Sequence, residues 1–255
     1  MCRISCSIRR LIFPERTSGN HITAQRVTKK RAASPRVSGD DLKKRARSIL
    51  RSLRREFPHP VTALRHENPF QLVIATILSA QCTDERVNMV TPGLFRKYPT
   101  PEHFAAASPA GLEEDIRSTG FFRMKTKSIM GCSRALIERH GGQVPDSMEE
   151  LVKLPGVGRK TANVVLGQAF GMASGVVVDT HVHRLSQRLG FTEADTAEAI
   201  EQDLMKIFAK KDWIDVGTVL ILHGRKTCVA RGPACPVCVV RDRCPSAGSF
   251  TRTSR

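Results

Sequence analysis

Hydrophobic positions recur at steps of three and four residues along most of the chain from Asp41 onward, which is the spacing of one face of an α-helix. In the first such stretch, before Pro58 ends it, these positions are Leu42, Ala46, Ile49, Leu50, Leu53 and Phe57. The one strand-like segment, 176–178, consists of three valines and is too short to found a sheet. The pattern therefore predicts an all-α fold of about ten helices.

Short signals at both ends of these stretches predict where the helices begin and end. A polar capping residue followed by a first-turn proline occurs at Asn68-Pro69, Thr100-Pro101 and Ser108-Pro109. Asp146 with Glu149, and Asp195 with Glu198, have the spacing of capping boxes. Glycines that are typical of helix ends stand at Gly120, Gly141, Gly171 and Gly190.

The net charge of the chain indicates which class of partner it binds. The chain has 41 Lys and Arg against 24 Asp and Glu, a net charge of +17, and its pI is about 10.1. Such a balance favours a nucleic-acid partner, although a merely basic protein is the alternative. No apolar stretch approaches the roughly 20 residues of a membrane helix, so we expect no membrane partner.

The composition of residues 1–40 predicts that this segment is a disordered basic arm. Residues 1–39 contain seven Arg, two Lys and one Glu and show no apolar periodicity. An arm of this kind attracts polyanions without sequence preference. The same composition is also typical of an organelle transit peptide, which stays open as an alternative.

A tight connection between two predicted helices carries the first candidate chemistry, at Leu154-Pro155-Gly156-Val157-Gly158-Arg159-Lys160. Gly156 and Gly158 permit positive φ and let backbone amides approach a ligand. Amides at a helix N-terminus attract anions, so on a basic chain the segment favours a grip on a DNA phosphate. An ordinary helix–helix connection is the alternative.

Lys160 and Asp179 are a candidate catalytic pair. The helix dipole and the like charge of Arg159 both favour the uncharged Lys160 amine, which a nucleophile requires. The helix carries the chain about 20 Å away, and residues 171–178 can span about 26 Å on the return. Asp179 could then take the proton of the amine or stabilise a cationic sugar. On spacing alone, an inert surface lysine, with Asp179 only capping the helix from Thr180, is the alternative to this pair.

Four of the eight cysteines form the pattern Cys228-x6-Cys235-x2-Cys238-x5-Cys244. The other four are scattered and no secretory signal precedes them, so we expect reduced thiols rather than disulfides. Four thiolates hold a zinc ion or an iron–sulfur cluster, and the spacing leaves these two open.

Several motifs in one order resemble the endonuclease III family of helix-hairpin-helix DNA glycosylases. The likeness covers roughly residues 42–245, and it is carried by Leu78-Ser79-Ala80-Gln81-Cys82-Thr83-Asp84, by Leu154 to Val165, by Val178-Asp179-Thr180-His181-Val182, by Ile221-Leu222-His223-Gly224-Arg225 and by the cysteine spacing. The resemblance implies two helical lobes that flank a DNA cleft. A six-helix barrel with the hairpin would take residues 62–173, and an iron–sulfur lobe would combine 41–61 with 174–246, ahead of a flexible tail at 247–255.

The resemblance also implies an activity in base excision repair. The enzyme would remove oxidised or damaged pyrimidines from double-stranded DNA and cut the strand. Lys160 would attack the sugar C1′ and form a Schiff base, β-elimination would cleave 3′ to the abasic site, and Asp179 would assist the loss of the base. A [4Fe–4S] cluster would be held by Cys228, Cys235, Cys238 and Cys244.

We expect a monomer that acts in a bacterial cytoplasm at the nucleoid. The nucleus or a mitochondrion is the alternative if the arm is a targeting segment.

Further DNA contacts are implied for Gln81, Phe121, Gly156, Gly158, Arg159, His181 and Arg231. The damaged nucleotide must leave the base stack, and Gln81 matches the family residue that fills the vacated space. Phe121 departs from a bulky aliphatic residue in the family, and either wedges into the duplex or belongs to the core. Arg231 is the one basic residue between the first two cluster cysteines, where the family has several, so a weaker phosphate grip is expected there.

Two other functions fit part of these motifs. A related cluster-bearing glycosylase removes adenine from mismatches; it lacks the hairpin lysine and carries a further C-terminal domain, whereas this chain has Lys160 and ends 11 residues after Cys244. A non-catalytic, structure-specific DNA-binding protein would use the hairpin and the cluster as grips, and would bind DNA without cutting it.

Overall fold

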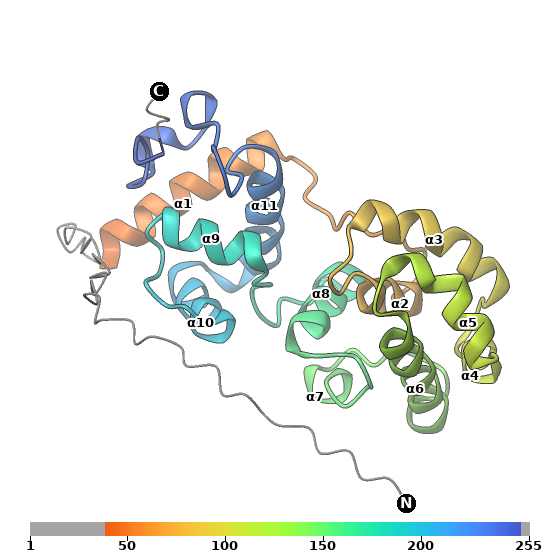
Figure 1. Cartoon of the computed structure of the whole chain (residues 1–255). Coiled ribbons are helices and arrows are strands. Elements are labelled where there is room, and N and C mark those ends of the chain that lie inside the picture. The colour runs from red at the N-terminus through yellow and green to blue at the C-terminus, as the bar shows by residue number, and fades with distance from the viewer. Residues whose placement is uncertain (1–38, 251–255) are drawn as a thin grey trace, which may run out of the picture. The chain divides into compact units, whose positions relative to one another are not determined.

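The computed structural model describes residues 39–250, and in this range it contains helices and no strand (Figure 1). The α-helices are α1 (Gly39–Glu56), α2 (Pro69–Leu78), α3 (Asp84–Lys97), α4 (Pro101–Ala106), α5 (Pro109–Ile116), α6 (Phe122–His140), α7 (Met148–Leu151), α8 (Arg159–Phe170), α9 (Thr180–Arg188), α10 (Ala197–Ile207) and α11 (Trp213–Lys226). Short 3-10 helices are η1 (Arg117–Thr119), η2 (Lys210–Asp212), η3 (Cys235–Val237) and η4 (Arg241–Arg243). The prediction of an all-α fold is confirmed. No helix in the described range has the length and apolar character needed to cross a membrane.

Local capping explains where several helices begin. The Asn68 side chain accepts a hydrogen bond from the Gln71 amide, as its position predicts, and Thr83 accepts one from the Arg86 amide. Thr100 and Ser108 also stand at the N-cap positions of α4 and α5, but their side chains make no capping hydrogen bond. In these two helices the proline alone marks the first turn.

The two predicted capping boxes are wrong by one residue. The N-caps are Ser147 and Thr196 rather than Asp146 and Asp195, and they accept from the backbone amides of Glu150 and Ala199. In each case a hydroxyl residue follows an aspartate, and both types of side chain cap well. The register is therefore decided by the packing of the buried side chains of each helix rather than by the cap itself.

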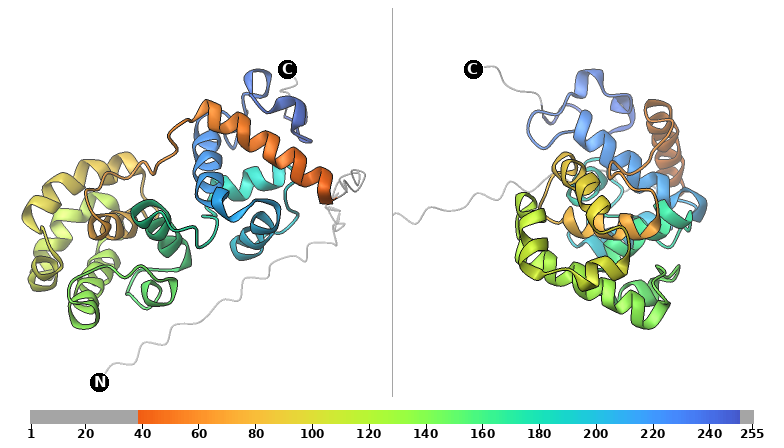
Figure 2. Two further views of the ribbon diagram at one scale, coloured as in Figure 1. Left: turned by 180° about the vertical axis from the view of Figure 1, so that it is seen from behind. Right: turned by 90° about the vertical axis from the view of Figure 1, so that its right-hand side faces the viewer.

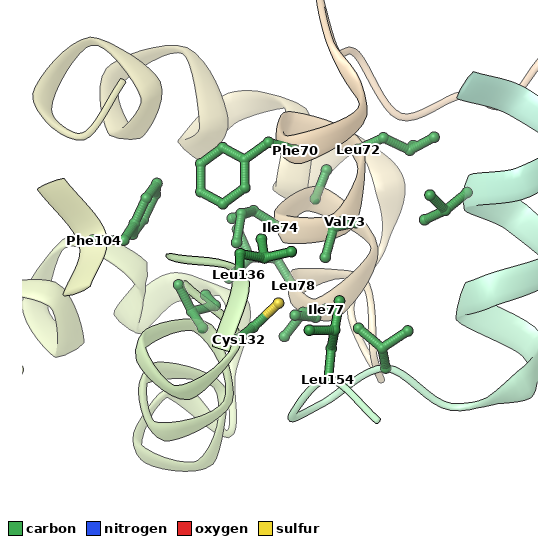
Figure 3. Close-up of a cluster of buried hydrophobic side chains, with 14 of the residues drawn as sticks. Phe70, Leu72, Val73, Ile74, Ile77, Leu78, Phe104, Cys132, Leu136 and Leu154 are labelled. Atoms are coloured by element: carbon green, nitrogen blue, oxygen red, sulfur yellow. The ribbon is translucent and has the colours of Figure 1, made fainter. Parts of the chain in front are cut away.

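A first core lies within residues 64–166 and is built around α2. Eight of the ten residues of α2 are buried, because neighbouring helices cover it on nearly all sides. Figure 3 shows Ile74 and Leu78 of α2 directed toward Cys132 and Leu136 of α6. The range 62–173 contains six α-helices of six residues or more, together with the single turn α7.

A second core joins two segments that are far apart in the sequence. Ala46, Ile49, Leu50 and Leu53 of α1 are buried together with side chains of α9, α10 and α11. Figures 1 and 2 show α1 lying beside α11, near the C-terminal end of the described chain. The N-terminal helix therefore packs with the last helices, and the chain must cross between the two cores at 57–63 and again at 171–175.

Two predicted boundaries differ from the structure. Helix α1 begins at Gly39, so residues 39 and 40 belong to a helix rather than to the arm, and the rest of the arm lies outside the described residues. Residues 247–250, predicted to begin a flexible tail, form turns, and the Arg188 guanidinium lies 4.3 Å from the centre of the Phe250 ring.

Candidate active site

Three of the predicted site residues line one cleft. Gln81 follows α2, Lys160 lies on α8 and Asp179 precedes α9, and all three border the same cavity of about 290 Å³. Further wall residues come from the segment before α2, from the start of α3, from the segment before Asp179 and from α11. The structure therefore brings the hairpin lysine, the acidic residue and the loop glutamine together at one opening.

The hairpin between α7 and α8 depends on one glycine for its conformation. Gly156 has φ +79°, and a Cβ there would lie 2.7 Å from the Ser128 Cβ, so both backbone and packing require glycine. Gly158 does not have the positive φ that the sequence predicted; its backbone is extended and it is the N-cap of α8. It offers no capping side chain, so the first amides of α8 are left for a ligand.

Lys160 is exposed in the first turn of α8. It makes no hydrogen bond or ion pair with any residue in the described range 39–250, so its amine is available to the cleft. Its neighbour Arg159 is bound to Glu201 by two hydrogen bonds, from Nε to Oε2 at 2.8 Å and from Nη2 to Oε1 at 3.2 Å. These bonds raise the pKa of Arg159 and compensate its charge, which weakens the predicted repulsion between Arg159 and Lys160.

Asp179 is the N-cap of α9 and also lines the cleft. Its Oδ1 accepts hydrogen bonds from the amides of His181 and Val182, both at 2.8 Å. Within the described residues Oδ2 has no hydrogen-bond partner. The two alternatives for Asp179 are therefore compatible, because capping fixes the carboxylate through one oxygen and leaves the other free.

A buried carboxylate, missed by the sequence reasoning, joins the elements that carry Lys160 and Asp179. Glu201 of α10 is 4% exposed and, besides Arg159, accepts from Asn163 Nδ2 at 2.9 Å. Asn163 in turn accepts from Ser174 Oγ at 2.8 Å, and a Cβ at Gly175 would collide with Glu201 Oε1. Glu201 thus ties the first turn of α8 to the segment that leads to Asp179.

An ion pair at the cleft was also missed. Arg225 of α11 donates to Asp84 of α3 at 2.6 Å, and both residues line the cleft. Each stands at the end of a motif that carried the family resemblance. Their places in these motifs were the one sign in the sequence that the two residues matter. No spacing rule could pair them, because they are 141 positions apart.

Two predicted contacts occupy exposed loops with an uncommon backbone. Gln81 has φ +53° and Phe121 has φ +48°, and within the described residues they are the two positive-φ positions that are not glycine. Phe121 is 63% exposed, which excludes the core alternative for its side chain.

The remaining predicted contacts lie outside the cleft lining. His181 is half-buried, its Nδ1 lies 3.1 Å from Arg184 Nη2, and burial lowers its pKa. It also packs so closely against α11 that a Cβ at Gly224 would lie 2.9 Å from the His181 Cβ. Arg231 is exposed in the loop between the first two cysteines of the cluster motif.

The four clustered cysteines line one small cavity beside the second core, and none forms a disulfide. Arg188 Nη1 lies 3.3 Å from Cys228 Sγ, and His223 Nε2 lies 3.5 Å from Cys238 Sγ. In the part of the chain that the structure describes, no group of three or more His, Cys, Asp and Glu side chains is arranged to hold a metal ion. The four cysteines thus share the lining of one cavity.

An all-helical fold in which a hairpin lysine and an acidic helix cap share a cleft is the arrangement of a helix-hairpin-helix protein. Residues 74–210 match the model of the HhH-GPD superfamily base excision DNA repair protein. Endonuclease III of Synechocystis sp. is 53% identical over 80% of this chain and 94% of its own length, and endonuclease III of Bacillus subtilis is 48% identical over 74% and 86%.

Solved structures are similar as well. A structure of a non-covalent endonuclease III–DNA complex has a TM-score of 0.78 and 45% identity, covering 81% of this chain and 97% of that one. A trapped endonuclease III–DNA covalent intermediate gives the same values. The chain belongs to the endonuclease III family within the HhH-GPD superfamily. It is a DNA-binding enzyme of base excision repair, a glycosylase and abasic-site lyase with Schiff-base chemistry.

Proposed function

We propose that Lys160 is the nucleophile and Asp179 its acid–base partner in the removal of damaged pyrimidines from double-stranded DNA. The observation that carries the proposal is the shared cleft, where Lys160 is the one lysine among the described lining residues. A covalent endonuclease III–DNA intermediate has been trapped in a relative that is 45% identical, and a covalent bond to DNA requires a nucleophile on the protein.

The proposed reaction uses the two groups in order. The lone pair of Lys160 Nζ attacks C1′ of the deoxyribose, the bond from C1′ to the base breaks, and the base leaves with the bonding electrons. Asp179 Oδ2 takes a proton from the attacking amine, while Oδ1 keeps its two hydrogen bonds to α9. The C1′–O4′ bond then breaks to give the Schiff base, and O4′ takes a proton from solvent. Water removes a C2′ proton, and the electrons of that C–H bond expel the 3′-phosphate by β-elimination.

We propose that the hairpin holds a DNA phosphate through the uncapped amides at the start of α8. The extended Gly158 leaves these amides without a competing side chain, and the positive end of the helix dipole attracts the anion. Arg159 contributes less than a free arginine would, because Glu201 already pairs with it. Arg231, which is exposed, is a second phosphate contact, and His181 supports the cleft from behind through its packing on Gly224.

Gln81 and Phe121 are proposed to enter the duplex when the damaged nucleotide leaves the stack. Both are exposed at the tips of short loops, as a side chain that replaces an extruded base must be. An aromatic ring at position 121 can stack on the neighbouring bases, and the Gln81 amide offers both a donor and an acceptor.

We also propose that Cys228, Cys235, Cys238 and Cys244 hold a [4Fe–4S] cluster. Four cysteines around one cavity suit a group larger than a single ion, and the nearby Arg188 guanidinium offers an N–H donor to anionic sulfur. When bound, the cluster supplies four iron–thiolate bonds that cross-link the chain between residues 228 and 244. The monomeric state and the location in the cell stay predictions from the sequence.

Borohydride trapping tests the catalytic assignment. DNA that contains thymine glycol or an abasic site should form a covalent complex with the wild-type enzyme when the Schiff base is reduced, and Lys160→Ala should abolish it. Lys153→Ala is the matched control, because Lys153 lies in the same hairpin but pairs with Glu150 and does not line the cleft. Equal trapping by Lys160→Ala, or binding of damaged DNA without any adduct in the wild type, would contradict the proposal.

A further inference from the structure

Among the described residues, one lysine is buried in the first core, and none of these residues pairs a carboxylate with it. Lys125, in the first turn of α6, is 4% exposed. Its Nζ donates to the carbonyl oxygen of Leu78 at 2.8 Å and to that of Thr119 at 2.7 Å. Burial lowers the pKa of Lys125, so this position carries a cost in free energy that a surface lysine does not have.

The two carbonyl groups belong to the ends of two different elements. Leu78 is the last residue of α2 and Thr119 is the last residue of η1. Carbonyls at helix ends lack partners within their own helix, and a cation stabilises the negative end of the helix dipole. The ammonium group therefore fastens the end of α2 to the end of η1, 41 residues further along the chain.

Each of these ends leads directly into one of the two strained loops. Gln81 lies three residues after Leu78, and Phe121 lies two residues after Thr119. A non-glycine residue with positive φ costs on the order of 1–3 kcal/mol and persists only where its surroundings hold it. The Lys125 side chain bonds to the helix end that precedes each loop, and its own amide also donates to the Phe121 carbonyl at 3.1 Å.

We propose that Lys125 is a positioning residue that holds the loops of Gln81 and Phe121 at one fixed separation. The inference rests on the proposed entry of these two side chains into the duplex. Two side chains that enter the same duplex must approach it together, and a common anchor couples their positions. Lys125 touches neither DNA nor the reacting atoms and acts only through the two loops.

The effect should depend on whether a base must be extruded. Excision of thymine glycol requires the damaged nucleotide to leave the stack and the gap to be filled, whereas a preformed abasic site has no base to extrude. We therefore measure two single-turnover rates, excision of thymine glycol and cleavage at a preformed abasic site, and take their ratio. A partly unfolded variant lowers both rates by the same factor and leaves the ratio unchanged.

Lys125→Met removes the ammonium group and keeps most of the aliphatic chain. We expect the ratio to fall roughly tenfold or more, because small displacements of positioning groups are costly. Lys127→Met is the matched control: Lys127 is an exposed lysine of the same helix, and its ratio should equal that of the wild type. If Lys125→Met yields no folded protein, Lys125→Gln replaces it, since its amide retains N–H donors on a shorter side chain.

Substitutions in the two loops separate this inference from the proposed function. Gln81→Ala and Phe121→Ala should each lower the ratio of the two rates. When Lys125→Met is added to the double variant of Gln81 and Phe121, the ratio should change by no more than about twofold, because Lys125 acts only through these two loops. A normal ratio for Lys125→Met, with lowered ratios for the loop variants, overturns the positioning role and leaves the proposed function intact. Wild-type ratios for the two loop variants would overturn the proposed entry of Gln81 and Phe121 into DNA, and the positioning role of Lys125 would fail with that proposal. A ratio that falls further in the triple variant would show that Lys125 acts through something other than these two loops.

Discussion

The two cores of this protein are built differently. The first core takes its buried side chains from one continuous stretch, 64–166, and α2 is covered on nearly all sides by apolar neighbours. The second core has fewer buried hydrophobic residues and takes them from α1 and from 176–240. Arginine side chains supply further links there: Arg54 pairs with Asp212 and Asp215, and Arg45 donates to the carbonyl groups of Leu189 and Gly190.

This difference indicates how each region is stabilised. A continuous apolar core needs no outside group, whereas a smaller core that recruits a distant helix depends on polar cross-links and on the proposed cluster. The candidate active site lies where the chain passes from the first core to the second. Lys160 stands on α8, beside the first core, and Asp179 opens α9 in the second.

The largest effect on stability is expected when one of the four clustered cysteines is replaced. Cys228→Ser should remove the iron, about four atoms per chain in the wild type. Because metal binding contributes on the order of 10 kcal/mol in small metal-dependent domains, the second core should lose its order. Iron analysis and hydrogen exchange check this: α1 and α11 should lose protection while α2 keeps it. Cys82→Ser is the control, and zinc in place of iron in the wild type would contradict the cluster.

Truncation of one leucine in each core tests whether the stability of the two cores depends differently on the proposed cluster. Leu72→Ala and Leu185→Ala each remove a fully buried side chain, and each should lower the free energy of unfolding by about 3–5 kcal/mol. In the Cys228→Ser background, Leu72→Ala should still lower the free energy of unfolding by the same amount. Leu185→Ala should not lower it further there, because the second core has already lost its order. Urea unfolding followed by hydrogen exchange measures both, and equal costs in both backgrounds would show that the two cores do not differ in this way.

A smaller effect is expected at the crossing between the cores. Glu201→Gln removes the charge that binds Arg159, and one buried hydrogen-bond partner is worth about 1–3 kcal/mol. Borohydride trapping should become slower at unchanged affinity for a stable abasic-site analogue, because Lys160 and Asp179 lose their common support. Glu198→Gln, exposed on the same helix, should trap at the wild-type rate. A loss of affinity without slower trapping would assign Glu201 to binding instead.

The smallest effect concerns a thiol in the first core. Burial raises the pKa of Cys132 to about 12, so near neutral pH almost all of this thiol is uncharged and little of the reactive thiolate forms. Iodoacetamide at about pH 8 should therefore label the partly exposed Cys82 and leave Cys132 unmodified in the folded protein. Peptide mass spectrometry distinguishes them, and equal labelling would show that the first core opens readily.

Much of the fold followed from local patterns. The periodicity from Leu42 to Phe57 predicted α1, and the capping residues Asn68 and Asp179 predicted the starts of α2 and α9. The two capping boxes failed by one residue because neighbouring Asp and hydroxyl side chains cap about equally well. Local signals therefore identify a helix more reliably than its first residue.

The candidate site was predictable only in part. Lys160, Asp179 and Gln81 were identified from motifs, and the structure places them on one cleft. Glu201 and Lys125 were missed, because a charged residue on an amphipathic helix is normally exposed and neither stands in a motif. Their importance comes from burial, and burial is a property of the folded chain.

The sequence by itself determined the helices, the hairpin, the family and the catalytic candidates, since these depend on residues only a few positions apart. Tertiary structure alone decided which charged groups became buried anchors. Arg159 and Glu201 are 42 positions apart and Lys125 reaches a carbonyl 47 positions away, and no local rule links such partners. The physical reason is that a buried charge is stable only where distant parts of the fold supply its hydrogen bonds.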